Sequence, residues 1–188
     1  MIIHPKPAND RSDKSNLGYL HIYTGAGKGK TSAALGAMVR AAGQGQRVVM
    51  IQFLKGHKDA GEVQTAQTMK NVELLQFGRP ELTSLDQLQA MDEYLANQGL
   101  NYAREVMRRR RPDLLILDEI TTAVQYRLLL IEDVVDFLDN RHRATEVILT
   151  GREAHPALLN MADLVTVMQP TKHYFQYQGF QPRWGIER

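Results

Sequence analysis

The chain has 188 residues, of which 43% are apolar and 23% are charged, and its net charge is +2. This length suits a single domain with a full hydrophobic core, and the balance of residues excludes a disordered, fibrous or membrane-spanning class. There is no cysteine, which excludes a disulfide framework, a thiolate nucleophile and a thiolate metal site.

The N-terminal segment differs from the rest of the chain. Residues 1–17 contain two prolines and a mixture of polar and charged residues, and they lack the apolar core of a signal peptide. We expect a flexible tail at 1–17, one α/β domain over 18–188, and a cytoplasmic protein without a membrane partner.

Strand and helix patterns alternate along the first half of this domain. Glycines at 43 and 45 end the first helical segment. The near-continuous apolar run VVMIQF is typical of a buried parallel strand. The predicted elements are a strand at Gly18 to Tyr23, a helix at Thr31 to Ala42, a strand at Val48 to Phe53, a polar loop at Lys55 to Gly61 and a short strand at Val72 to Phe77.

The second half continues the alternation. A helical pattern begins at Ser84 and predicts either one long helix or two joined ones. The elements that follow are strands at Leu114 to Leu117, Glu146 to Leu149 and Leu164 to Met168, and helices at Ile131 to Leu138 and Pro156 to Met161. Alternating strands and helices predict a parallel sheet that is covered on both faces.

Four consecutive arginines, Arg108 to Arg111, precede Pro112. Such a run can indicate nucleic-acid binding, but cations also gather in the last turn of a helix, where they face water and the negative end of the helix dipole. We favour the second interpretation, and a nucleic-acid partner is not expected.

A phosphate-binding loop is the clearest motif. Small residues let the backbone wrap a polyphosphate, and the helix that follows adds the positive end of its dipole. In this interpretation Lys30 reaches the outer phosphates and the Thr31 hydroxyl ligates Mg²⁺. The usual first glycine is replaced by Thr24, and Lys28 is an extra lysine. The loop reads Thr24-Gly25-Ala26-Gly27-Lys28-Gly29-Lys30-Thr31.

A second motif ends the strand LLIL with Asp118 and Glu119. This is a Walker B arrangement, because the strand delivers carboxylates to the edge of the sheet where open α/β folds bind ligands. Asp118 would hold Mg²⁺ directly or through water, and Glu119 would lie beside the ion or the nucleotide. An acidic pair that only starts a helix is the alternative.

Further cations follow other elements. Arg152 comes after a strand and suits bidentate binding of phosphate oxygens, although a surface arginine after a turn is the alternative. Arg40, within the first helix, is either a second cation near the nucleotide or exposed. His173, beside Lys172, follows the last strand and is a weaker candidate.

Five segments together resemble one family. They are TGAGKGKTSAALGAMVRAAGQG, VVMIQFLKG, LLILDEI, VILTGR and QPTKHYFQYQGFQPRWGIER. Their combination resembles the P-loop type of ATP:corrinoid adenosyltransferases, which act in cobalamin synthesis and salvage, and the resemblance runs from Gly18 to Arg188.

The resemblance implies a RecA-like, P-loop NTPase fold that binds MgATP (or MnATP) in an orientation reversed from that of most P-loop proteins. It implies catalytic roles for Lys30, Glu119 and Arg152, and metal binding by Thr31, Asp118 and Glu119. The implied nucleotide-binding residues are Thr24, Gly25, Ala26, Gly27, Lys28, Gly29, Lys30, Thr31, Ser32, Arg40, Arg152, Lys172 and His173.

The implied reaction is attack of Co(I) on the 5′ carbon of ATP, with triphosphate as the leaving group. Since Co(I) is already a strong nucleophile, the protein needs to align the reactants and neutralise the leaving group rather than supply a nucleophile. The substrate would be cobalamin or a cobyrinic acid derivative. The family also implies a homodimer and possible electron supply by a flavoprotein.

One departure from the family concerns aromatic rings. Well-known members carry a Phe-Thr-Trp segment that helps remove the lower cobalt ligand, and this chain has Leu82-Thr83-Ser84 at that place. Tyr126 or Tyr174 could substitute for the missing rings. The alternatives to adenosyl transfer are a P-loop ATPase or small kinase, and a nucleotide-dependent corrinoid-binding module without turnover.

Overall fold

The protein is described by a computed structural model that covers residues 17–80, 82, 84–174, 183, 185 and 186. Most of the predicted tail at 1–17 therefore lies outside the described residues. The strands form one parallel sheet of six in the order β3-β2-β4-β5-β1-β6, which confirms the predicted architecture. Their bounds are β1 Leu20–Thr24, β2 Val48–Phe53, β3 Val72–Phe77, β4 Leu114–Asp118, β5 Glu146–Thr150 and β6 Leu164–Val167.

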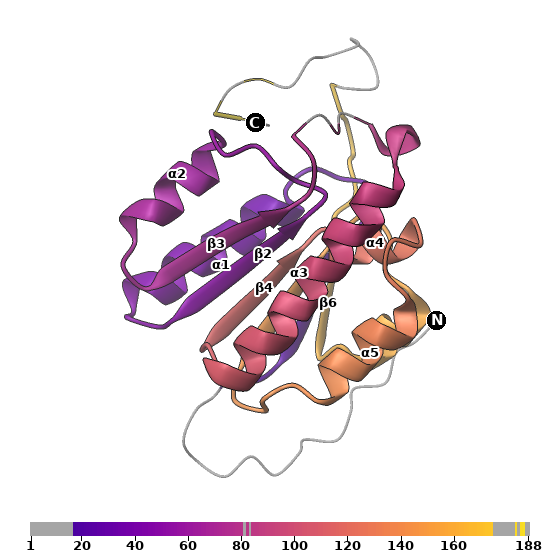
Figure 1. The fold of residues 1–188 in the computed structure, drawn as a ribbon. Helices are drawn as coiled ribbons and strands as arrows, with labels where there is room; N and C mark the ends of the chain where they lie inside the picture. The colour runs from indigo at the N-terminus through magenta and orange to yellow at the C-terminus, as the bar shows by residue number, and fades with distance from the viewer. Residues whose placement is uncertain (1–16, 81, 83, 175–182, 184, 187–188) are drawn as a thin grey trace.

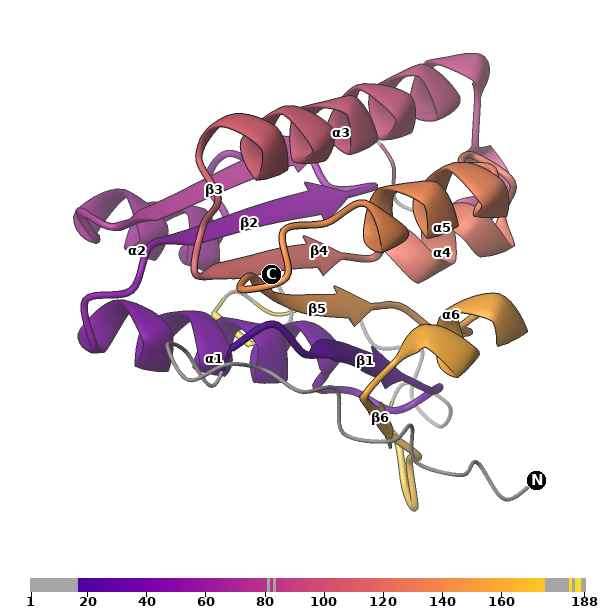
Figure 2. The same ribbon diagram turned by 90° about the horizontal axis from the view of Figure 1, so that it is seen from below.

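Helices cover both faces of this sheet (Figure 1). Seen from below, α1 lies against one face, and α3, α4 and α5 lie against the opposite face (Figure 2). The helices are α1 Lys30–Gly43, α2 Gly61–Thr68, α3 Ala90–Arg109, α4 Ile120–Gln125, α5 Ile131–Asp139 and α6 Pro156–Met161, with a 3-10 turn η1 at Leu85–Gln87. No helix within the described part of the chain is long and apolar enough to cross a membrane.

Two hydrophobic cores follow from the alternation of side chains along the strands. In β2, Val48 and Met50 pack toward Met38 of α1, whereas Ile51 and Phe53 pack toward the α3 face. Every residue of β2 and β4 is buried, which accounts for their continuous apolar runs.

Two short helices were not predicted. Helix α2 begins at Gly61, where the predicted polar loop ends, and α4 follows Glu119 directly. Neither segment is long enough to show a clear helical period in the sequence. The stretch after Ser84 forms η1 and then the single helix α3, which continues through Gly99. A Cβ at Gly99 would lie 2.9 Å from a ring carbon of Phe53, so glycine lets α3 approach the sheet closely.

The arginine run behaves as the end of a helix. Arg109 pairs with Glu105 at 3.2 Å, and Arg110 pairs with Glu73 on β3. The run is exposed. These pairs support the interpretation of a solvated helix terminus.

The start of the domain is fixed to the sheet by Glu146 of β5. Its carboxylate accepts hydrogen bonds from the backbone N–H groups of Gly18 and Tyr19 at 2.7 and 2.8 Å, and His21 Nε2 lies 2.8 Å from its other oxygen. These contacts hold β1, and therefore the loop that follows it, in register with β5.

Candidate functional site

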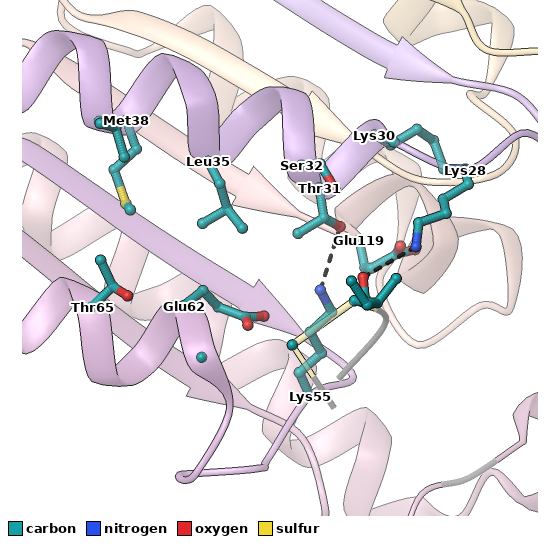
Figure 3. Close-up of a pocket in the computed structure, with 15 residues that line it drawn as sticks. Lys28, Lys30, Thr31, Ser32, Leu35, Met38, Lys55, Glu62, Thr65 and Glu119 are labelled. Carbon is teal, nitrogen blue, oxygen red and sulfur yellow. Dashed lines mark hydrogen bonds between the residues drawn. The ribbon is translucent and has the colours of Figure 1, made fainter. Parts of the chain in front are cut away.

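A cavity of about 580 Å³ opens at the carboxyl edge of the sheet, between the first turns of α1, the β2–α2 loop and the end of β4 (Figure 3). This is the edge at which ligands of open α/β sheets bind. Its lining residues are Lys28, Gly29, Lys30, Thr31, Ser32, Leu35, Met38, Val39, Lys55, Gly61, Glu62, Thr65, Glu119, Gly185 and Ile186.

The glycine loop is held by its neighbours in the sheet. Gly27 N donates to Met168 O at 2.7 Å, and Gly25 N donates to Arg152 O at 2.9 Å. Gly25 has a φ of 106° and a Cβ there would lie 2.4 Å from Met168 O, so only glycine fits. The Thr24 hydroxyl donates to Arg152 O at 2.9 Å. Threonine at the usual glycine position therefore ties the loop to the turn after β5.

Lys30 lies inside the loop that it closes. Its ammonium donates to Gly25 O at 2.7 Å and to Gly27 O at 2.8 Å, and the residue is only 9% exposed. Burial lowers the pKa of Lys30, and the charge of Arg152 lowers it further, while Glu119 opposes the shift. Lys30 is also the first residue of α1, whose first-turn N–H groups have no partner within the helix and can face an anion.

Lys28, the extra lysine of the loop, points toward the C-terminal residues. Its ammonium donates to Ile186 O at 3.1 Å and to the Tyr174 hydroxyl at 3.4 Å. The side chain still lines the cavity. Lys28 thus joins the phosphate-binding loop to the end of the chain.

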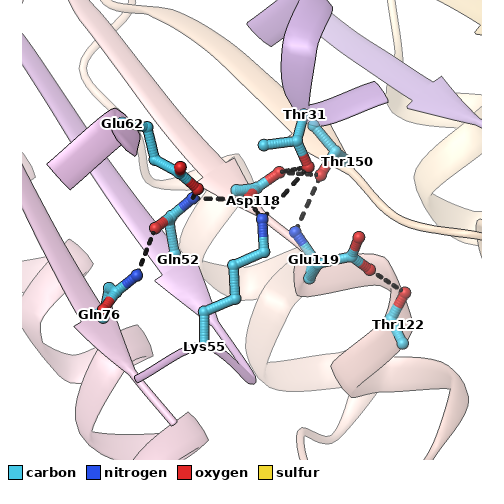
Figure 4. Close-up of polar contacts among 9 residues, drawn as sticks. All are labelled: Thr31, Gln52, Lys55, Glu62, Gln76, Asp118, Glu119, Thr122 and Thr150. Atoms are coloured by element: carbon cyan, nitrogen blue, oxygen red, sulfur yellow. Dashed lines mark hydrogen bonds and ion pairs between the residues drawn. The ribbon is translucent and has the colours of Figure 1, made fainter. Parts of the chain in front are cut away.

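Asp118 is the centre of a buried polar network (Figure 4). It is fully buried, and its Oδ1 accepts from the hydroxyls of Thr31 and Thr150 at 2.9 and 2.7 Å. Its Oδ2 accepts from Lys55 Nζ at 2.7 Å and Gln52 Nε2 at 3.1 Å. Burial would raise the pKa of Asp118, but the charge of Lys55 and the hydrogen bonds of this network hold the pKa below its usual range.

Glu119 lines the cavity together with Glu62 of α2. Its backbone has a φ of 64°, and its N–H donates to the Thr150 hydroxyl at 2.9 Å. The side chain accepts a hydrogen bond from the Thr122 hydroxyl at 2.6 Å. The turn between β4 and α4 therefore directs Glu119 outward while Asp118 stays behind it.

Lys55 and Gln52 are site residues that the sequence interpretation missed. The register of the sheet pairs Gln52 with Asp118, and Lys55 follows two residues after β2 ends. The sequence predicted the strand Val48 to Phe53 and placed Lys55 in the polar loop after it, but the neighbour of that strand was unknown from sequence. Only the order β2-β4 brings Lys55 beside Asp118.

Several predicted residues lie outside the cavity lining. Arg40 is exposed on α1, and its charge acts on Tyr23 instead. Arg152 contributes backbone contacts to the loop while its residue is exposed. Lys172 is exposed, and the His173 ring packs against Tyr174 at a centroid distance of 5.1 Å. Ala26 is an exposed residue of the loop.

The residues present fit a divalent cation that is bound together with a nucleotide. The Thr31 hydroxyl and the Glu119 carboxylate both line the cavity, and oxygen ligands are what Mg²⁺ prefers. Within the described ranges no group of three or more His, Cys, Asp or Glu side chains could hold a metal alone. Phosphate oxygens would therefore have to complete the coordination, as is common for Mg²⁺.

The positions of the missing aromatic pair are Leu82 and Ser84. Leu82 is half-buried, Ser84 is exposed and Thr83 lies outside the described residues. Phe77 packs against Tyr102 of α3 with ring centroids 5.9 Å apart, so its ring belongs to the hydrophobic core between β3 and α3. Tyr126 is 41% exposed.

The parallel sheet, the glycine loop at the start of α1 and the carboxylates after β4 define a RecA-like P-loop nucleotide-binding protein. A KaiC-like protein from Pyrococcus horikoshii is similar in fold, with a TM-score of 0.55 at 15% sequence identity, and the match covers 84% of this chain and 76% of that one. The family is shown by the sequence. Residues 16–188 match the model of the family described as ATP:corrinoid adenosyltransferase BtuR/CobO/CobP, and the chain belongs to this family.

Curated relatives agree with this assignment. The corrinoid adenosyltransferase of Escherichia coli (strain K12) is 35% identical over 170 residues, which are 90% of this chain and 85% of that protein. Corrinoid adenosyltransferase CobA of Salmonella typhimurium is 34% identical with the same coverage. A corrinoid adenosyltransferase of Pseudomonas aeruginosa is 29% identical over 186 residues, covering 99% of this chain and 90% of that one.

Proposed function

We propose that the protein transfers the 5′-deoxyadenosyl group of ATP to the reduced cobalt of a corrinoid and releases triphosphate. The observation that carries this proposal is the family match over residues 16–188. The cavity supports it, because its lining gathers three lysines around the phosphate-binding loop. That charge suits the neutralisation of a leaving triphosphate.

In this mechanism the chain aligns the reactants and stabilises the leaving group. Lys30 and the first-turn N–H groups of α1 bind the phosphates, so that negative charge that develops on the leaving oxygen meets donors that are already in place. Glu119 and Arg152 are proposed as the further catalytic residues. A Mg²⁺ ion bound with ATP would add positive charge at the phosphates, and Thr31 and Glu119 would hold it.

The substrate, the oligomeric state, the location and the electron donor are proposed from the family resemblance. We infer that the substrate is cobalamin or a cobyrinic acid derivative, that the working form is a homodimer in the cytoplasm, and that a flavoprotein supplies electrons to the cobalt. The absence of aromatic residues at Leu82 and Ser84 suggests a corrinoid without a tightly held lower ligand, or another ring such as Tyr126 in that role.

Incubation with ATP, Mg²⁺ and chemically reduced cobalamin tests the proposal. We expect the light-sensitive spectrum of adenosylcobalamin together with one triphosphate for each corrinoid converted. The Lys30→Ala variant should lose this activity, whereas Lys58→Ala, at an exposed lysine of the β2–α2 loop, should retain it. Phosphate or diphosphate as the sole product, formed equally without corrinoid, would instead support a P-loop ATPase or kinase.

A further inference from the structure

Lys55 stands out because its ammonium lies at the cavity wall between the buried carboxylate of Asp118 and the hydroxyl of Thr31. It extends from the β2–α2 loop toward the first turn of α1, 2.7 Å from Asp118 Oδ2 and 3.4 Å from the Thr31 hydroxyl (Figures 3 and 4). The Asp118 side chain is fully buried, while the Lys55 side chain keeps 29% of its surface exposed. The pair therefore has a buried anion behind and a cation that faces the cavity.

The hydrogen-bonding capacity of Asp118 is already used. A carboxylate offers about four acceptor positions, and Thr31, Thr150, Gln52 and Lys55 fill two on each oxygen. Asp118 is thus built to hold its neighbours in place. This differs from the direct metal contact that the sequence allowed for Asp118. Of the three predicted metal ligands, only Thr31 and Glu119 line the cavity.

Lys55, in contrast, retains donor capacity. An ammonium has three N–H donors, of which one meets Asp118 and a second points toward Thr31 at the longer distance. The side chain lines the same cavity as Lys28, Lys30 and Thr31. A phosphate bound against the first turn of α1 is within reach of the remaining donor.

We propose that Lys55 is a phosphate-binding cation of this site, anchored by Asp118, and that it contributes to triphosphate binding in the absence of a divalent metal. The proposal rests on the proposed function only in taking a triphosphate as the ligand.

Binding of inorganic triphosphate, measured by calorimetry in the presence of EDTA, tests this role directly. A charge-assisted hydrogen bond of this kind corresponds to a loss of roughly 10- to 100-fold in affinity for the Lys55→Met variant. The matched control Lys58→Met removes an exposed lysine of the same loop, and its affinity should stay within about twofold of the wild type.

A double variant separates binding from a purely structural role. Lys55→Met alone leaves the buried Asp118 charge without its cation, which can destabilise the fold. In Lys55→Met with Asp118→Asn both charges are removed, and we expect triphosphate affinity to remain as weak as in the single variant. Recovery of wild-type affinity in the double variant, or unchanged affinity in Lys55→Met, would overturn the proposal. Neither outcome touches adenosyl transfer, which the cobalamin assay decides separately.

Discussion

Thr150 is expected to be the most sensitive uncharged side chain of the network behind the site. It is fully buried at the end of β5, donates to Asp118 Oδ1 at 2.7 Å and accepts from Glu119 N at 2.9 Å. Replacement by valine keeps the shape and removes both bonds. Asp118 loses one of its donors, and the Glu119 N–H is left without this acceptor in a half-buried turn.

The cost follows from those two losses. A hydrogen bond to a charged group contributes about 1.5–3 kcal/mol, and an unsatisfied polar group costs about 1–3 kcal/mol. We therefore expect Thr150→Val to lower the free energy of unfolding by about 3–5 kcal/mol. Thr145→Val is the matched control, because Thr145 is equally buried but donates only to the neutral carbonyl of Pro112 at 2.7 Å. Its cost should be about 1–2 kcal/mol.

Urea unfolding at neutral pH measures the difference. With a slope of about 2 kcal/mol per M, the midpoint of Thr150→Val should fall by about 2 M, and that of Thr145→Val by less than half as much. Equal midpoints for the two variants would show that the charge of Asp118 adds nothing to the Thr150 hydrogen bond. The expected extra stabilisation by the Thr150–Asp118 hydrogen bond would then be refuted.

Three further changes test other parts of the account. Gly25→Ala should lower the melting temperature by about 6–12 °C, because alanine disfavours the positive φ and its Cβ would clash with Met168 O; an unchanged melting temperature would contradict the loop geometry. The folded pKa of Glu146 is lowered, since its hydrogen bonds and His21 outweigh burial. Its stabilising effect is therefore full above the ordinary carboxyl pKa of about 4.3 and is lost as pH falls through the lowered value. The stability gap between wild type and Glu146→Gln should shrink in acid, and a gap independent of pH would refute this. Leu82→Phe with Ser84→Trp should raise the rate of adenosylation from Co(II) cobalamin and a reductant, and an unchanged rate would show that the ring positions do not matter here.

The fold could be predicted because strong local patterns determine it. The apolar runs at Val48–Phe53 and Leu114–Asp118 are buried on both sides, and such runs indicate parallel strands without knowledge of their neighbours. The loop before Lys30 can be recognised from its glycines, because the backbone there has positive φ angles and passes close to Met168. Short helices such as α2 were missed because eight residues give a weak periodic signal.

The site was predicted only where its residues are adjacent in sequence. Lys30, Thr31 and Glu119 lie in or beside contiguous motifs and line the cavity together. Lys55 depends on the strand order, which a local pattern does not contain. Arg40 shows the converse. Its place on α1 was correct, but it is exposed and does not line the cavity, and which residues of α1 line the cavity depends on the face of α1 that packs on the sheet.

The proposed reaction breaks ATP at the 5′ carbon rather than at phosphorus. ATP carrying ¹⁸O in the bridge between the 5′ carbon and the α-phosphorus distinguishes the two directly, when turned over with Mg²⁺ and reduced cobalamin. We expect all of the label to leave with intact triphosphate, as seen by mass spectrometry, in step with adenosylcobalamin formation. Label retained on the nucleoside, with phosphate or diphosphate released, would contradict it.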